Sequence, residues 1–224
     1  SNFVRTGIGK QIFDDFDSTT LSASIWGTIS TWAADTTIDR AKFNSGTTGY
    51  LLTSATYSYL VASSKFRKVA SQTDAQQFVL FAKRDGSNHY ALRCYPNKTT
   101  ANVELLKHGT ALGTVNFTFT AGTDYQINFL VIAESGNIRL RVSIDGVEKF
   151  NYLDSITPWT AAGNFGVYGS GDSNASYHIN IDNPVVCSTD VITITNLVEG
   201  QKAELLNAGD SVVATTPQVG VGQT

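Results

Sequence analysis

The chain of 224 residues contains no methionine and only two cysteines, four prolines and three histidines. Because it begins at Ser1-Asn2 without methionine, we expect a processed piece of a longer protein. The two cysteines, Cys94 and Cys187, are too few for a disulfide framework or a cysteine-based zinc site. They could form one disulfide in an oxidising compartment or be two small buried apolar residues. The sequence leaves both alternatives open.

Charge is also scarce, since only 16% of the residues are charged and the net charge is −3. A nucleic-acid-binding protein would need a basic stripe, so no nucleic-acid partner is expected. The longest uncharged stretches are rich in threonine, serine, glycine and asparagine, which excludes a membrane-spanning helix, and no membrane insertion is expected. With 42% hydrophobic residues, the chain can still bury a core.

What the chain does have is the composition of β-sheet proteins. Threonine, serine and 19 glycines are abundant, and aromatic residues make up 11% of the chain. Little lysine and glutamate beside much threonine, serine and asparagine is typical of secreted and surface β-proteins. We therefore expect an extracellular or cell-surface location.

Short strands separated by turn residues recur along the first part of the chain. Apolar and polar residues alternate most clearly over 138–144, which places Ile138 and Leu140 on one face of a strand and Arg139 and Arg141 on the other. No sustained helical pattern interrupts these segments, so the fold class is all-β, a sandwich or jelly roll. The expected strands are 57–61, 76–82, 89–95, 101–106, 114–119, 125–132, 138–144, 147–150, 164–168 and 177–181.

The character of the chain changes near residue 190. Three further strands are expected over 191–197, 201–206 and 211–215, too few for an independent sandwich. We therefore divide the chain into a domain over residues 1–189 and a partial second β module, or a C-terminal extension, over residues 190–224. An incomplete sandwich exposes strand edges, which predicts self-assembly through the C-terminal segment.

Both ends of the first domain resemble the concanavalin A-like lectin and glucanase (laminin-G-like) jelly-roll family. The run Ile12-Phe13-Asp14-Asp15-Phe16-Asp17, followed by Leu21 and Trp26, is similar to the family's first strand. Asn164-Phe165-Gly166-Val167-Tyr168-Gly169 and the strand over 177–183 are similar to its last strands. The resemblance implies two packed antiparallel sheets in which the first and last strands pair. Residues 191–215 resemble the first strands of immunoglobulin-like modules.

The family contains both enzymes and non-catalytic binding modules, so the fold leaves function open. Retaining glycosidases need two carboxyl groups about 5–5.5 Å apart, which one strand supplies at alternate positions. Neither Glu104, Glu134 nor Glu148 begins such a motif. A dispersed pair such as Glu104 with Asp145 stays open, but the absence of motifs favours a protein that is not an enzyme.

An acidic cluster near the first strand is a candidate metal site. Asp14, Asp15 and Asp17 repel one another unless a positive charge is near. The resemblance implies a structural Ca²⁺ where the first strand meets the last, held by Asp15 or Asp17 with Asp182 and completed by backbone and water oxygens. The alternatives are a solvated acidic turn or an aspartate paired with Arg5.

Candidate sugar-binding residues lie on the polar strand faces. If Tyr90, Leu92 and Cys94 face the core, then His89, Arg93 and Tyr95 share an outer face, and Arg139 and Arg141 lie on the outer face of another strand. Arginine and aromatic side chains suit the recognition of sugar hydroxyl and carboxylate groups. Further aromatic residues could join them, and the alternative is an ordinary solvated face. These further candidates are Trp32, Tyr57, Tyr59, Tyr168 and His178.

The sequence thus predicts a non-catalytic carbohydrate-binding or adhesive module of a larger secreted or cell-surface protein, with a polysaccharide or glycan as partner. The alternative is a structural component of a surface layer, extracellular filament or virion that assembles through its β edges.

Overall fold

The computed structural model describes residues 10–14, 16, 18–36, 39–43, 48–68, 76–170, 179–188, 204–206 and 212–215. All regular elements in these ranges are β-strands, and none of these residues belongs to a helix long and apolar enough to cross a membrane. The chain separates into two compact units. One comprises Gly9–Thr189, and the other combines Ser1–Ile8 with Asp190–Thr224.

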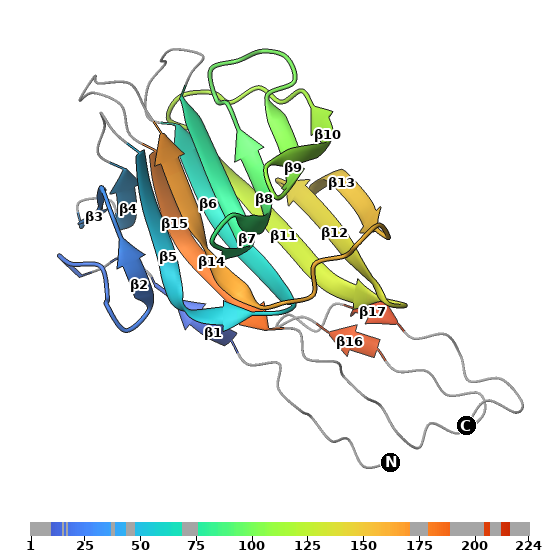
Figure 1. Ribbon diagram of the computed structural model, residues 1–224. Helices are drawn as coiled ribbons and strands as arrows, with labels where there is room; N and C mark the ends of the chain where they lie inside the picture. Colours follow the sequence, from blue (N-terminus) through green and yellow to red (C-terminus); the bar gives the residue numbers. More distant parts are fainter. Residues whose placement is uncertain are drawn as a thin grey trace, which may run out of the picture. The chain divides into compact units, whose positions relative to one another are not determined.

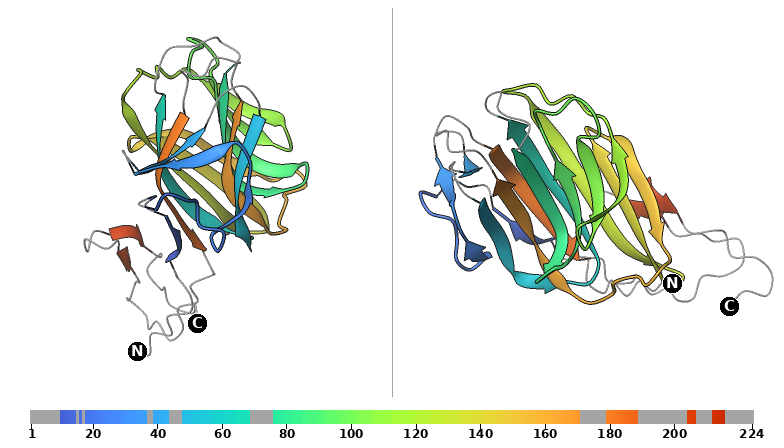
Figure 2. Two further views of the ribbon diagram at one scale, coloured as in Figure 1. Left: turned by 90° about the vertical axis from the view of Figure 1, so that its left-hand side faces the viewer. Right: turned by 45° about the horizontal axis from the view of Figure 1, so that its top comes forward.

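The larger unit is a sandwich of two antiparallel sheets that form two layers (Figure 1, Figure 2). One sheet has eight strands in the order β13-β12-β11-β6-β15-β4-β3, with β1 paired to β15 beside this path. Its strands are β1 (Lys10–Phe13), β3 (Trp32–Asp35), β4 (Arg40–Phe43), β6 (Leu60–Lys68), β11 (Asp124–Glu134), β12 (Asn137–Ile144), β13 (Val147–Asp154) and β15 (Ile179–Ser188).

The other sheet has seven strands in the order β10-β9-β8-β7-β14-β5-β2. The strands of the seven-stranded sheet are β2 (Trp26–Ile29), β5 (Thr48–Tyr57), β7 (Gln77–Asp85), β8 (Asn88–Cys94), β9 (Val103–Lys107), β10 (Thr110–Val115) and β14 (Gly163–Ser170).

In the smaller unit, β16 (Glu204–Leu206) pairs with β17 (Val212–Thr215). The predicted immunoglobulin-like character of residues 190–224 stays a prediction.

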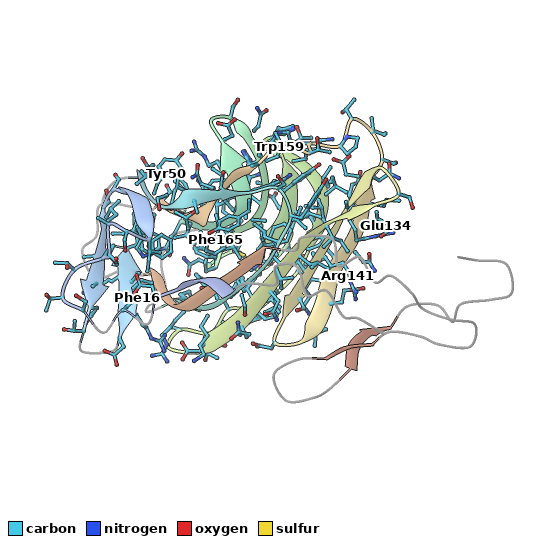
Figure 3. All side chains as sticks on the ribbon, turned by 90° about the horizontal axis from the view of Figure 1, so that it is seen from below. Phe16, Tyr50, Glu134, Arg141, Trp159 and Phe165 are labelled. Carbon is cyan, nitrogen blue, oxygen red and sulfur yellow. The ribbon has the colours of Figure 1, made fainter. Side chains whose placement is uncertain are left out.

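The core lies between the two sheets and follows the alternation of the strands. On β12, the residues from Ile138 to Ile144 at alternate positions are at most 1% exposed, and on β8 the side chains of Tyr90, Leu92 and Cys94 are fully buried. Phe165 lies between the two layers (Figure 3). Burying each large apolar side chain contributes about 1.5–3 kcal/mol to folding. The all-β class and the facing of both strands are therefore confirmed.

The two ends of the larger unit meet as the resemblance implied. Strand β1 pairs antiparallel with β15, with Phe13 opposite Val185. Just after β1, the carboxylate of Asp14 accepts hydrogen bonds from the indole Nε1 of Trp26 (2.6 Å) and from the backbone N–H of Phe16 (3.0 Å). The ring of Phe16 stacks on that of Trp26, with 6.3 Å between centroids. Three residues of the first motif thus contact one another directly.

Two expected strands differ from the structure. Residues 57–61 are not one strand, because β5 ends at Tyr57 in one sheet and β6 begins at Leu60 in the other. Residues 116–119 also lie outside β10. There the buried side chain of Asn102 hydrogen-bonds both the N–H (2.8 Å) and the C=O (2.6 Å) of Phe117, which replaces a neighbouring strand as the partner of this backbone.

Candidate functional site

Aromatic side chains gather on the outer face of the seven-stranded sheet. Tyr50 on β5 and Tyr168 on β14 are cross-strand neighbours, with 4.8 Å between their ring centroids. Tyr50 also stacks on Phe81 of β7 (6.3 Å), and Phe81 meets the edge of His89 on β8 (5.4 Å). We call Tyr50, Phe81, Arg84, His89 and Tyr168 the tyrosine patch. Its two tyrosines are half-buried, and neither hydroxyl has a hydrogen-bond partner among the described residues.

Arg84 lies across this patch. Its guanidinium carbon is 4.6 Å from the ring centroid of Tyr50 and 5.5 Å from that of Phe81, both cation–π contacts. It makes no ion pair or side-chain hydrogen bond with any residue that the structure describes. The guanidinium is thus held in place by ring faces, and its N–H donors find no acceptor in the described part of the chain.

The floor under the patch is apolar and depends on a glycine. Gly166 on β14 is the cross-strand partner of both Leu52 on β5 and Phe81 on β7, so at this level of the sheet no side chain stands between the two. A Cβ at Gly166 would lie 2.2 Å from the carbonyl oxygen of Leu51. Strand β14 therefore approaches β5 too closely at this position for any side chain.

Hydrogen bonds fix His89 at the edge of the patch. Its Nε2 accepts the N–H of Gly109 (2.9 Å), and its backbone N–H donates to Nδ1 of His108 (3.0 Å). Burial lowers the pKa of His89, and the positive charges of Arg84 and Arg93 lower it further. The imidazole is therefore held in its neutral form near neutral pH.

A buried lysine anchors the strand that carries Arg84. The side chain of Lys83 is fully buried, and its Nζ donates to the carbonyl oxygens of Ser58 (3.0 Å), Trp159 (2.8 Å) and Ala161 (3.1 Å). Burial lowers the pKa of Lys83 to about 8. These bonds tie the loop between β13 and β14 to the end of β7, next to the patch.

The structure brings together three of the predicted ligand-binding residues. His89, Arg93 and Tyr95 lie on or next to β8, on the outer face of the seven-stranded sheet. Arg93 forms an ion pair with Glu104 on β9 (2.5 Å), and its guanidinium lies 5.4 Å from the ring centroid of Tyr95. The ring of Tyr95 is also covered by Lys98, with 3.9 Å between Nζ and the centroid. Within this group, the Arg93 charge is already balanced by a carboxylate.

Arg139 and Arg141 lie in the other sheet, on β12, and are not part of this face. Arg139 forms an ion pair with Glu134 (2.6 Å), and Arg141 forms one with Glu148 (2.6 Å). These hydrogen-bonded guanidinium groups lower the pKa of both glutamates. In Figure 3, Glu134 and Arg141 lie in one layer and Tyr50 on the outer side of the other.

The predicted calcium ligands stay a prediction. Asp15 and Asp17 lie outside the described residues, and Asp182 belongs to β15, where its cross-strand partner is Lys65. Both carboxylate oxygens of Asp14 are already bound to protein donors. In the part of the chain that the structure describes, no group of three or more metal-ligating side chains occurs.

The structure also bears on the possible Cys94–Cys187 disulfide and on the possible pair of catalytic carboxylates. Cys94 is a buried free thiol, so it forms no disulfide with Cys187, and burial raises its pKa. Glu104 and Asp145, the dispersed carboxylate pair, lie in different sheets, on β9 and in the turn between β12 and β13. The structure does not bring them together on one strand or one sheet.

Sequence reasoning missed Tyr50 and Arg84. Arg84 lies beyond the expected strand 76–82, whereas β7 continues to Asp85. Tyr168 was named, but its facing could not be decided. Strict alternation groups Arg84 with Leu80 and Ala82, which face the core, but the bulge between Phe81 and Lys83 shifts the alternation, so that Lys83 is buried and Arg84 lies over the rings of the outer face.

No sequence model of a known protein family matches this chain, and no curated protein matches it. Solved structures do match. A carbohydrate-binding module, CBM66 from Bacillus subtilis, is 16% identical with a TM-score of 0.55, covering 75% of this chain and 99% of its own. The carbohydrate recognition domain of Emp47p is 15% identical with a TM-score of 0.60, covering 78% and 93%. A Bacillus licheniformis β-glucanase is 12% identical with a TM-score of 0.60, covering 81% and 99%. The chain therefore has the concanavalin A-like jelly-roll fold.

Proposed function

We propose that this chain is a non-catalytic carbohydrate-binding module that holds a polysaccharide on its tyrosine patch. The observation that carries the proposal is the pair of half-buried tyrosines, Tyr50 and Tyr168, whose ring centroids are 4.8 Å apart and whose hydroxyls bond to none of the described residues. Sugar sites combine an aromatic surface, against which the apolar face of a sugar ring packs, with a few polar groups that bind its hydroxyls. The patch supplies both on one sheet face.

The comparisons support the same class of ligand. Two of the matching structures are named as a carbohydrate-binding module and a carbohydrate recognition domain. The third is named as a β-glucanase, so the fold itself does not separate binding from hydrolysis. Against hydrolysis stands Glu104, whose carboxylate is held by Arg93, and the location of Asp145 in the other sheet.

The proposed setting is a larger secreted or cell-surface protein, which the threonine- and serine-rich composition supports. In that setting the module would attach its parent protein to a polysaccharide. Assembly through the C-terminal segment, which would make the chain a structural component instead, stays a prediction that rests on residues 190–224.

Binding to polysaccharides tests the proposal directly. The full chain should be retarded in native gels that contain a soluble polysaccharide, and Tyr168→Ala should remove most of the retardation because it deletes one wall of the patch. Arg141→Ala, on the other sheet, is the matched control and should migrate like the wild type. Thermal melts of all three proteins check that the variants fold.

Failure would take one of two forms. A wild-type chain that no polysaccharide in a broad panel retards is not a carbohydrate-binding module. A Tyr168→Ala variant that folds and is retarded as strongly as the wild type would place the sugar elsewhere.

A further inference from the structure

We propose that Arg84 makes the tyrosine patch selective for acidic polysaccharides, in which a sugar carboxylate pairs with its guanidinium. This inference rests on the proposed function, since it names the class of sugar that the same site would take. Every other arginine in the described ranges already has a carboxylate partner: Arg40 and Arg67 share Asp124, and Arg93, Arg139 and Arg141 pair with Glu104, Glu134 and Glu148.

The guanidinium of Arg84 is positioned before any ligand arrives. It is held over Tyr50 at 4.6 Å and over Phe81 at 5.5 Å, so part of the entropy of fixing a long side chain has already been lost in the free protein. Contact with ring faces leaves the planar edge of N–H donors without acceptors. A ligand that supplies two acceptor oxygens in one plane would satisfy them.

The charges around Arg84 do not cancel its own. Asp85, the next residue, makes no ion pair with it. Arg93 and Glu104 neutralise each other on the neighbouring strands. His89 is held neutral, because its Nε2 accepts the N–H of Gly109 and because burial disfavours its charged form. Of the five residues of the patch, Arg84 alone therefore carries a charge, which is positive, although the whole chain has a net charge of −3.

The chemistry of the partner follows from geometry and charge. A guanidinium binds a carboxylate through two parallel hydrogen bonds in one plane. A uronic acid ring packed against Tyr168 would present its carboxylate at the rim of the ring, on the side of the neighbouring Tyr50, whose ring the Arg84 guanidinium covers. A neutral sugar offers only hydroxyls and leaves the charge uncompensated.

Polygalacturonate and its fully methyl-esterified form make a matched pair of probes, because they share a backbone and differ in the free carboxylate. The full chain should bind polygalacturonate about tenfold or more tightly than the ester, the factor expected for a hydrogen-bonded charged pair. Arg84→Gln should remove this preference, and Arg84→Lys should keep part of it. Arg141→Gln, which removes an equal charge from the other sheet, should leave the preference intact.

The outcomes separate this inference from the proposed function. Binding to neutral polysaccharides without preference for polygalacturonate, or an Arg84→Gln variant that keeps the preference, overturns the acidic class but leaves carbohydrate binding standing. No binding to any polysaccharide overturns both. Tighter binding to dextran sulfate than to polygalacturonate overturns the carboxylate as the recognised group, and an equal loss in Arg141→Gln overturns the assignment to Arg84.

Discussion

The two outer faces of the sandwich differ in how completely their polar groups are paired. On the eight-stranded sheet, Ser63 donates to Asn128 (2.7 Å) and Asn128 donates to Ser143 (3.2 Å), so a hydrogen-bonded row crosses β6, β11 and β12. The arginines beside this row are bound to carboxylates. On the seven-stranded sheet, Arg84 and the tyrosine hydroxyls have no such partners in the described part of the chain.

The polar groups on the outer face of the eight-stranded sheet thus bind one another, whereas the outer face of the seven-stranded sheet keeps polar groups available to a ligand. Exposed ion pairs and polar rows add little to stability, but they already occupy donors and acceptors that a ligand could use. A half-buried arginine on aromatic rings keeps its charge and its donors. The number of arginines on a face therefore says less about binding than whether each guanidinium already has a carboxylate.

Substituting Gly166 should have the largest effect, because β5 approaches this residue of β14 too closely for a side chain. Gly166→Ala would place a Cβ 2.2 Å from the carbonyl oxygen of Leu51, so strands β5 and β14 must shift. We expect a loss of about 3 kcal/mol in the free energy of unfolding. Urea unfolding monitored by tryptophan fluorescence measures it.

Gly113→Ala is the matched control for this substitution. Gly113 is also on a strand of the seven-stranded sheet, but its Cβ would lie at an ordinary 3.4 Å from the ring of Phe150. Its unfolding free energy should stay within about 0.5 kcal/mol of the wild type. Equal losses in the two variants would show that the close approach at Gly166 is unimportant.

Much of the fold could be predicted because the alternation of apolar and polar residues and the residues of tight turns can be read from short stretches of sequence. The alternation over 138–144 fixed which side chains enter the core, and the turns at Ser135-Gly136 and Asp145-Gly146 do adopt the positive φ angles of tight hairpins. Pairing of the first and last strands followed from the resemblance of both ends. The strand limits near residues 57–61 and 114–119 could not be predicted, because a sheet-to-sheet crossing and the side chain of Asn102 decide them.

The candidate site was harder to predict because it depends on cross-strand neighbours. Tyr50 and Tyr168 meet only because β5 and β14 pair in one register, although 117 residues of sequence connect them (168 − 50 − 1). Arg139 and Arg141 looked like a binding pair because the sequence shows two arginines at alternate positions but not the carboxylates on the neighbouring strands that pair with them. Which charges are free is a property of the register, not of the strand.

The pH dependence of stability should also distinguish the two faces, with a smaller effect than the substitution of Gly166. His89 has a pKa lowered by burial, so below pH 6.5 the unfolded chain binds more protons than the folded one and stability falls with falling pH. Glu134 and Glu148 have pKa values lowered by Arg139 and Arg141, so their contribution is lost only below pH 4.5. Between pH 6.5 and pH 4.5, the contribution of His89 to the free energy of unfolding should therefore change with pH, and the contribution of the two ion pairs on the eight-stranded sheet should not.

His89→Gln isolates this response, because glutamine can still accept the N–H of Gly109 but does not titrate. Urea unfolding at steps from pH 7 to pH 4.5 should show a shallower decline in the variant than in the wild type. Identical declines over this range would mean that His89 titrates alike in the folded and unfolded chains.

The smallest effect is expected from removing both arginines of the paired face. Arg139→Ala/Arg141→Ala breaks two exposed ion pairs, which salt already screens, so the unfolding midpoint should fall slightly at low ionic strength and match the wild type at high salt. Polysaccharide binding should be unchanged, because neither residue lies on the sheet that carries Tyr50, Arg84 and Tyr168. Loss of binding in this folded double variant would reverse the comparison: the ion pairs would then have to open for the sugar, and the binding face would be the eight-stranded sheet, which carries two of the five ligand-binding residues predicted from the sequence.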